Sequence, residues 1–229
     1  MDATWIRGAL LVLFGYLLGS VPFGVLVAKA FDREFDLRRA GSGNIGATNV
    51  ARTLGKGAGA LTLFLDAGKG VFALAPARIF LEPPAYLWLA LVGGAVFLGH
   101  VFSIYLRFKG GKGVATAFGV VLFLSPETAF VLIVLFIAVV YFTRYISLGS
   151  LCAAVGLPVT MAFLGKSREY VTLSLLIGFL VIYTHRENVH RLLAGPRRRA
   201  LVGAVGPHVA RPHVVAQVGP EDVVAQVAH

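Results

Sequence analysis

Apolar residues occur along this chain in long runs that are separated by short polar segments. The first runs cover residues 5–31, 58–81 and 85–106, and each is long enough to cross a hydrocarbon core that takes about 20 helical residues. Shorter apolar runs cover residues 114–124, 128–142, 148–164 and 171–183. The pattern predicts an all-α polytopic membrane protein with about seven transmembrane helices, some of them short.

Proline and polar residues punctuate these runs. Pro22 is expected to kink the first helix, and Ser125 followed by Pro126 is typical of the start of a new one. The segment 32–57 is polar and glycine-rich and is predicted to be a loop. Asp66 and Lys69 interrupt the second run three residues apart, and we expect them to form a supporting pair because single charges are costly at membrane depth.

Composition agrees with a membrane protein. Of the 229 residues, 57% are hydrophobic and 14% charged, with mean hydropathy +0.80, whereas soluble domains are about a quarter charged. The net charge of +10 favours anionic lipid and anionic substrates. Nucleic acid is not expected as a partner, because the aromatic residues lie in the apolar runs rather than in a basic patch. The single cysteine, Cys152, excludes an intramolecular disulfide.

Lys and Arg distribution predicts the topology. Basic segments at 32–57, 107–112, 144 and 185–199 alternate with the turns at 82–84, 125–127 and 165–170. Since cytoplasmic loops are enriched in Lys and Arg, the N-terminus is predicted outside and the C-terminus in the cytoplasm. Lys166 and Arg168 run against this pattern. Residues 1–195 are predicted to form the membrane domain, and 196–229 a basic and then low-complexity cytoplasmic tail without fixed structure.

The first of three polar stretches is GSGNIGATNVAR, residues 41–52. Its hydroxyl and amide groups suit a polyol, and the arginine at its end suits a phosphate. The alternative is a capped turn in which Ser42 and Asn44 bond their own backbone. The candidate ligand-contacting residues are Ser42, Gly43, Asn44, Thr48, Asn49 and Arg52.

The second stretch is GHVFSIYLRFKGGKGVAT, residues 99–116, in which a cationic, glycine-broken hinge joins two apolar runs. A helix that starts near Gly113 would add unpaired N–H groups and a positive dipole end to the lysine charges, which together suit a phosphate. The alternative is a glycine turn whose lysines mark the cytoplasmic side. Lys112 is followed by glycine, so this is not a nucleotide P-loop. The candidate residues are Lys109, Gly110, Gly111, Lys112 and Gly113.

The third stretch is THRENVHRLLAG, residues 184–195. On a helix, His185 and Asn188 lie on one face, and Arg191 continues it. The alternative is a solvated helix end whose arginines contact lipid phosphate. By the predicted topology, all three stretches emerge on the cytoplasmic face, which predicts an active site there.

These three segments resemble the signature motifs of the bacterial acyl-phosphate:glycerol-3-phosphate acyltransferase family, the PlsY type, and LDAGKG at 65–70 is similar to a further recurrent segment. The resemblance covers residues 1 to about 195. It implies a seven-helix membrane enzyme that transfers a fatty acyl group from acyl phosphate to the 1-hydroxyl of glycerol 3-phosphate, the first acylation of phospholipid synthesis. The family's residues important for activity match Ser42, Arg52, Lys112, His185 and Asn188, and its phosphate-binding loop matches the hinge glycines.

Two positions depart from the family pattern. Ser103 stands where the family usually has proline, which is expected to loosen the entry to the hinge. Thr184 stands where a basic residue is common.

An acyl phosphate carries a good leaving group, so no covalent enzyme nucleophile, cofactor or metal is expected. The cations at Arg52, Lys109, Lys112 and Arg191 would share the phosphates. His185 is the candidate proton acceptor, with a substrate phosphate as the open alternative. Ser42 is expected to orient the substrate, because no carboxylate completes a catalytic triad, and Asn188 completes the predicted catalytic set.

The expected partners are glycerol 3-phosphate, long-chain acyl phosphate, membrane lipid and the soluble enzyme that makes acyl phosphate. The expected location is the bacterial inner membrane. The competing hypothesis is a transporter or channel for a small organic anion, in which Asp66, Lys69 and the glycine-broken helices would line a path. That function needs polar groups spread across the bilayer, whereas here they gather at one face.

Overall fold

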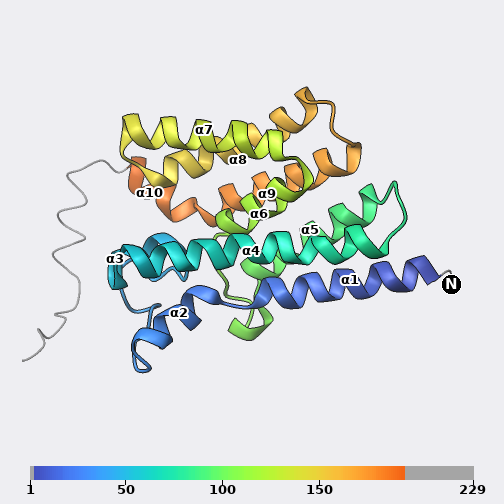
Figure 1. Cartoon of the computed structure of the whole chain (residues 1–229). Helices are drawn as coiled ribbons and strands as arrows, with labels where there is room; N and C mark the ends of the chain where they lie inside the picture. The colour runs from blue at the N-terminus through green and yellow to red at the C-terminus, as the bar shows by residue number, and fades with distance from the viewer. Residues whose placement is uncertain (1–2, 194–229) are drawn as a thin grey trace, which may run out of the picture. The chain divides into compact units, whose positions relative to one another are not determined.

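A computed structural model of the chain describes residues 3–193, and all regular structure within that range is helical (Figure 1). The predicted tail at 196–229 lies outside the described residues. In chain order the helices are α1 (Ala3–Ser20), α2 (Phe23–Phe31), α3 (Ala47–Leu54), α4 (Lys56–Phe80), α5 (Tyr86–Val101), the 3-10 turn η1 (Ile104–Leu106), α6 (Val114–Leu124), α7 (Pro126–Thr143), α8 (Ile146–Phe163), α9 (Arg168–Thr184) and α10 (Arg186–Leu193).

Five helical segments of the described chain are long and apolar enough to cross a membrane. They are Ala3–Phe31, Lys56–Phe80, Tyr86–Leu106, Pro126–Thr143 and Ile146–Phe163. The helices α6, with 11 residues, and α9, with 17, are shorter. The prediction of an all-helical polytopic membrane protein is therefore confirmed, while the number seven stays a prediction.

Two predicted helix boundaries have clear local causes. The first apolar run breaks between Ser20 and Phe23, because Pro22 lacks an N–H donor and disfavours the α conformation of the residue before it. The hydroxyl of Ser125 accepts a hydrogen bond from the Thr128 N–H at 3.4 Å, and Pro126 occupies the first position of α7. The sequence signals at both places are confirmed.

The loop predicted over residues 32–57 is partly wrong, since it contains α3 and the first two residues of α4. This short helix has apolar residues at positions 47, 50, 51 and 54, which is the spacing of an amphipathic helix, and Val50 among them is 0% exposed. The surrounding glycine and polar residues favoured the interpretation as a loop, although the apolar spacing fits a helix that is stabilised by burial against α4. The third apolar run was expected to stay helical to residue 106, whereas α5 ends at Val101 and is followed by η1.

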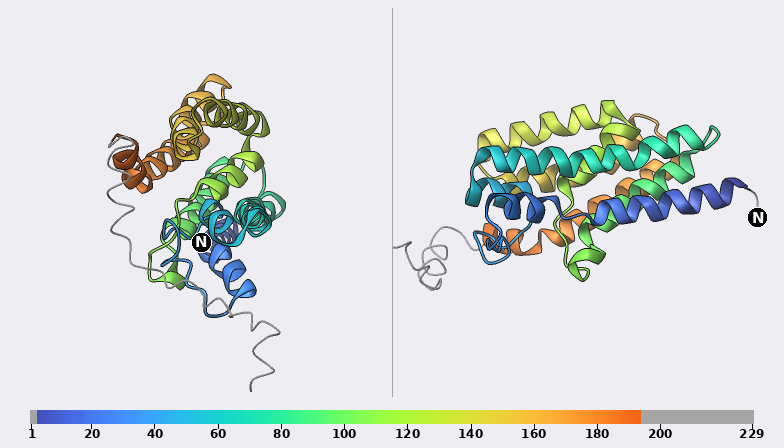
Figure 2. Two further views of the ribbon diagram at one scale, coloured as in Figure 1. Left: turned by 90° about the vertical axis from the view of Figure 1, so that its left-hand side faces the viewer. Right: turned by 60° about the horizontal axis from the view of Figure 1, so that its bottom comes forward.

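Small residues allow the helices to pack closely. The helix α1 lies beside α5, α4 beside α6, and α7 beside α8 (Figures 1 and 2). A Cβ atom added at Gly19 of α1 would lie 2.1 Å from the Val96 carbonyl oxygen of α5. One added at Gly119 of α6 would lie 1.9 Å from the Ala67 carbonyl oxygen of α4. Only glycine permits such backbone approach, which is the usual basis of helix packing in membranes.

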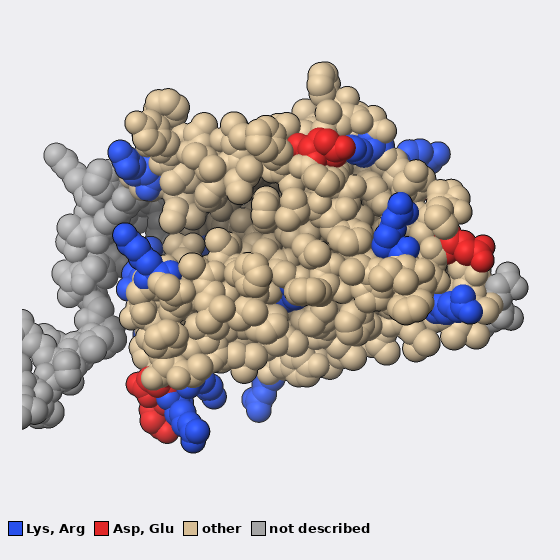
Figure 3. Space-filling model, viewed as in Figure 1, with Lys and Arg blue, Asp and Glu red and all other residues tan. Residues whose placement is uncertain are grey.

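Charged side chains gather at the two ends of the helical bundle, and the surface between them is largely uncharged (Figure 3). One end carries α2, α3 and the start of α10, and the other carries the connections α4–α5 and α8–α9 (Figure 1).

Candidate active site

Asn49 organises the first polar stretch. Its side chain, which is 2% exposed, donates hydrogen bonds to the carbonyl oxygens of Leu37 at 3.3 Å and Ala40 at 3.0 Å. Its Oδ1 accepts from the N–H of Ser42 at 2.7 Å and from the Ser42 hydroxyl at 3.1 Å. Both ends of the amide thereby bond within the protein, so this residue holds the loop in one conformation.

Other members of the stretch differ in their exposure. The Oδ1 of Asn44 accepts from the Gly46 N–H at 2.8 Å, the local turn that stood as the alternative interpretation. Ser42 is exposed, and so are Thr48 and Arg52, which lie four residues apart and therefore on one face of α3. A hydroxyl pair and a guanidinium group are thus presented at the surface of this end.

The hinge folds back along the end of α5. The Gly110 N–H donates to the Val101 carbonyl oxygen at 3.0 Å, and the Gly111 N–H donates to that of His100 at 3.1 Å. These two N–H groups are used within the protein, so they are not the donors that the predicted phosphate site needs.

Donors of the required kind lie three residues further on, at the start of α6. Gly113 has φ +81° and caps α6, which begins at Val114 as expected. The first intrahelical bond is made by the Ala117 N–H to the Gly113 carbonyl oxygen at 2.7 Å. The N–H groups of residues 114–116 therefore have no acceptor within the helix, and they point with the positive end of the dipole toward the hinge. This geometry is suited to an oxyanion.

His185 ends α9 and is 3% exposed. Its Nδ1 lies 2.8 Å from the Val181 carbonyl oxygen. A carbonyl oxygen only accepts, so Nδ1 carries the hydrogen, and Nε2 of the neutral ring carries the free lone pair. The pKa of His185 is lowered from 6.5 to about 4, chiefly by burial; the bond to Val181 opposes this shift, and the charge of Lys112 adds to it. The ring is therefore neutral at pH 7 and able to accept a proton.

Lys112 joins the second and third stretches. Its ammonium group donates a hydrogen bond to Oδ1 of Asn188, and its carbonyl oxygen accepts one from the Thr184 hydroxyl at 3.3 Å. Lys112 thus contacts two residues that lie 72 and 76 positions further along the sequence. A cation, an amide and a neutral imidazole, that of His185, meet at the start of α6.

The segment just before the first stretch reaches the hinge through a residue that sequence reasoning did not single out. The guanidinium group of Arg38 donates to the carbonyl oxygen of Lys109. That hinge segment has unusual backbone geometry, since Arg107 and Phe108 have φ 52° and 61°, values that non-glycine residues seldom adopt. The hydrogen bond from Arg38 thus helps to hold a hinge backbone whose conformation is unfavourable by itself.

Ser103 ties the entry of the hinge to the break between α1 and α2. It is 1% exposed, and its hydroxyl donates to the Ser20 carbonyl oxygen at 2.5 Å. Its own carbonyl oxygen accepts from the Phe108 N–H at 2.7 Å. The hydroxyl supplies a bond that proline could not make, while the expected loosening of the hinge entry stays a prediction. Elsewhere in the predicted set, Lys109 is exposed, and the side chain of Arg191 lies outside what the structure describes.

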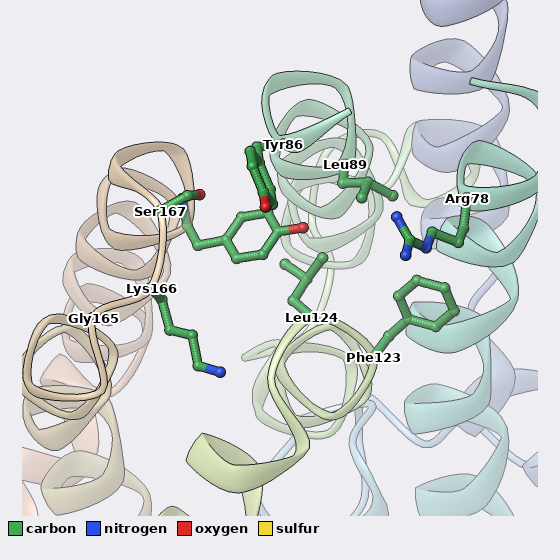
Figure 4. A pocket seen from close by; sticks show the side chains of 9 residues that line it. Arg78, Tyr86, Leu89, Phe123, Leu124, Gly165, Lys166 and Ser167 are labelled. Carbon is green, nitrogen blue, oxygen red and sulfur yellow. The ribbon is translucent and has the colours of Figure 1, made fainter. Parts of the chain in front are cut away.

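A cavity of about 490 Å³ occurs at the opposite end of the bundle (Figure 4). Arg78 and Lys166 extend toward it from different sides in that view. It is lined by Arg78, Tyr86, Leu89, Phe123, Leu124, Gly165, Lys166, Ser167 and Tyr170. None of these residues belongs to the three polar stretches, so the cavity is separate from the candidate active site.

Comparison with known proteins bears on this arrangement of residues. The family model described as glycerol-3-phosphate acyltransferase matches residues 9–195. A glycerol-3-phosphate acyltransferase of Dinoroseobacter shibae is 49% identical over 191 residues, which are 83% of this chain and 92% of the relative. One of Geotalea daltonii is 46% identical over 185 residues, 81% of this chain and 93% of the relative.

Two solved structures are also similar. The crystal structure of PlsY (YgiH), an integral membrane glycerol 3-phosphate acyltransferase, in its glycerol 3-phosphate form has a TM-score of 0.76 and 39% identity, covering 85% of this chain and 98% of that one. Its lysophosphatidic acid form has a TM-score of 0.75 and 40% identity, covering 82% and 92%.

Proposed function

Because the chain belongs to the glycerol-3-phosphate acyltransferase family, we propose that its acyl donor is a long-chain acyl phosphate and that the reaction takes place where the hinge meets Asn188. The protein is an enzyme of phospholipid synthesis that acylates glycerol 3-phosphate to lysophosphatidate. The observation that carries the proposed site is the contact of Lys112 with Asn188, beside the buried neutral ring of His185.

The donor follows from the chemistry that the residues support. In acyl transfer from an acyl phosphate, the 1-hydroxyl oxygen of glycerol 3-phosphate bonds to the carbonyl carbon. The bond from that carbon to the phosphate oxygen breaks, and phosphate leaves as an anion. The protein then has to hold two phosphates and accept one proton, and it needs no covalent intermediate. In support, the Ser42 hydroxyl is bonded to Asn49 and not to a base, which suits an orienting role.

The phosphates are assigned to the cationic end of the hinge. Lys112 and the unpaired N–H groups of residues 114–116 form the centre of this site, because charge and dipole act on the same point. Exposed Lys109 and Arg52 extend the positive surface, with Arg191 as a further expected contact. The N–H groups of Gly110 and Gly111 are used elsewhere, so these two residues shape the hinge.

His185 is assigned the proton of the attacking hydroxyl, through Nε2. Its Nδ1–H bond to Val181 fixes the tautomer in which that nitrogen is free. Asn188 is assigned to hold Lys112, and with it the bound alcohol, in register with the base. The other candidate base is a phosphate of the substrates themselves, and kinetics can distinguish the two.

Location and domain organisation complete the proposal. We place the protein in the inner membrane of a bacterium, with the end that carries α2, α3 and the start of α10 in the cytoplasm, because Lys and Arg are concentrated in the loops of that end. Glycerol 3-phosphate and the soluble enzyme that makes acyl phosphate would approach from that side. The match to residues 9–195 supports a catalytic unit over 1–195, and truncation after Arg199 is expected to leave activity unchanged.

The direct test uses the purified full-length protein in lipid with labelled glycerol 3-phosphate and palmitoyl phosphate, palmitoyl-CoA or palmitoyl carrier protein in parallel. Lysophosphatidate is expected with palmitoyl phosphate alone. Product with a thioester donor and none with the acyl phosphate would refute the assigned donor. Uptake of glycerol 3-phosphate into vesicles without acylation would instead support the transporter hypothesis.

A further inference from the structure

Four polar side chains form a buried polar network between α4, α5 and α6, and none of them has been given a part in the reaction above. Asp66, Lys69, His100 and Thr116 are each 5% exposed or less. The Lys69 ammonium lies 2.9 Å from Asp66 Oδ1 and donates to the Val21 carbonyl oxygen at 3.0 Å. The His100 Nδ1 lies 3.5 Å from Asp66 Oδ1 and 3.1 Å from the Thr116 hydroxyl. Each charge at membrane depth therefore has a partner.

This network ends at the hinge. The His100 carbonyl oxygen accepts the hydrogen bond from the Gly111 N–H at 3.1 Å. A Cβ atom added at Gly111 would lie 2.5 Å from Nε2 of the His100 ring. The glycine thus rests against both the backbone and the ring of one residue, and the ring occupies the space that any side chain at position 111 would need.

We infer that Gly111 is required because it seats the His100 ring, and that the buried polar network positions the hinge, and with it Lys112, for the substrate phosphate. This inference rests on the proposed phosphate site. A buried ring with partners on one edge and the hinge on the other has a single available orientation. His100 is accordingly a positioning residue, and the space it fills is closed to a direct approach of phosphate to the Gly111 Cα from that side.

The neighbouring glycine provides a matched control. A Cβ atom added at Gly110 would lie 2.0 Å from the His100 carbonyl oxygen and 2.5 Å from that of Val101. Both are backbone atoms, so no substitution of a side chain can relieve that contact. The two glycines are therefore expected to respond differently to a change of the residue at position 100.

The experiment is a pair of double-mutant cycles in the full-length enzyme, with palmitoyl phosphate and glycerol 3-phosphate as substrates. Gly111→Ala and Gly110→Ala are each combined with His100→Asn, which retains an amide donor toward Asp66 and Thr116 but lacks Nε2. In the parent, Gly111→Ala is expected to raise KM for glycerol 3-phosphate about tenfold or more. In the His100→Asn background it should change KM less than about threefold, whereas Gly110→Ala should cost the same in both backgrounds.

An equal rise in KM from Gly111→Ala in both backgrounds would overturn the inference. The glycine would then be needed for contact with the substrate and not for the His100 ring. His100→Ala replaces His100→Asn if the latter does not fold, since it also removes the clashing atom. Thr116→Val tests the other end of the network: a raised KM at nearly unchanged kcat is expected, and unchanged values of both would overturn the positioning role. Failure of the proposed function is separately visible, because the parent enzyme would then form no lysophosphatidate.

Discussion

The proton acceptor can be identified from the pH dependence of turnover, because the two candidates titrate in different ranges. His185 has a pKa of about 4, so at pH 7 only about one ring in a thousand is protonated. If this ring is the base, kcat at saturating substrates should stay level from pH 7 down to about 5 and fall to half near pH 4. A phosphate monoester has its second pKa at about 6, so a substrate base would halve the rate two pH units higher.

The perturbation that completes the test is His185→Asn. An asparagine amide can still donate to the Val181 carbonyl oxygen, as Nδ1 does at 2.8 Å, but it offers no proton acceptor in place of Nε2. We expect kcat to fall about 100-fold or more, with KM for glycerol 3-phosphate changed much less. The remaining activity should acquire a transition near pH 6, set by the substrate phosphate. Turnover is measured as labelled lysophosphatidate between pH 4 and 8, at matched amounts of folded protein.

Two results would refute this reasoning. A parent enzyme that loses half its turnover near pH 6, together with an active His185→Asn variant, would assign the base to the substrate phosphate.

The fall in turnover at low pH also has to be distinguished from a loss of protein stability at low pH. The folded-state pKa lies below the ordinary 6.5, so burial of the neutral ring stabilises the fold fully above pH 6.5, and this stabilisation is lost as the pH falls through 6.5 toward about 4. Thermal unfolding at each pH provides the control.

Three further outcomes are expected. Asn49→Ala removes four hydrogen bonds of the first loop; it should lower the midpoint of thermal unfolding and also raise KM, and unchanged values would show that the loop holds its shape without the amide. Lys112→Met and Asn188→Leu should each raise KM, and the double variant should cost less than the sum by about 1–3 kcal/mol, measured from kcat/KM; strict additivity would mean that their contact does not act in catalysis. A cysteine introduced beside Glu82 should react with an impermeant reagent from outside, and one beside Thr184 only from the cytoplasm; external labelling of both would contradict the assigned orientation.

The parts of the fold that could be predicted from the sequence are those in which local residues mark where a helix starts and ends. The bounds of α6 agree with the predicted run 114–124, because Gly113 opens the helix and Ser125 with Pro126 closes it. The helix α3 was missed because its apolar residues, at amphipathic spacing over only eight positions, lie within a glycine-rich polar segment, and so short a helix depends on burial of Val50 for its stability.

The site shows the same division. Residue types indicated that Lys112, His185 and Asn188 bear chemistry, and the fold brings the lysine into contact with the asparagine. The bond from Arg38 to the Lys109 carbonyl oxygen spans 71 positions and involves a backbone acceptor, so no residue pattern predicts it. Likewise, the conclusion that Gly111 faces His100 depends on the path of the hinge, which is a property of the tertiary structure.

The two departures from the family pattern show what the hinge requires. Proline at position 103 would fix φ, and the φ of Ser103, −63°, is the value that proline imposes. Serine reaches the same conformation and adds a bond to Ser20, so a rigid ring is replaced by a hydrogen bond across two helices. Thr184 likewise bonds the Lys112 carbonyl oxygen where a charged side chain is common. In both cases a hydroxyl donates to a backbone carbonyl oxygen, that of Ser20 or that of Lys112, so in this chain both side chains support the path of the main chain that carries Lys112.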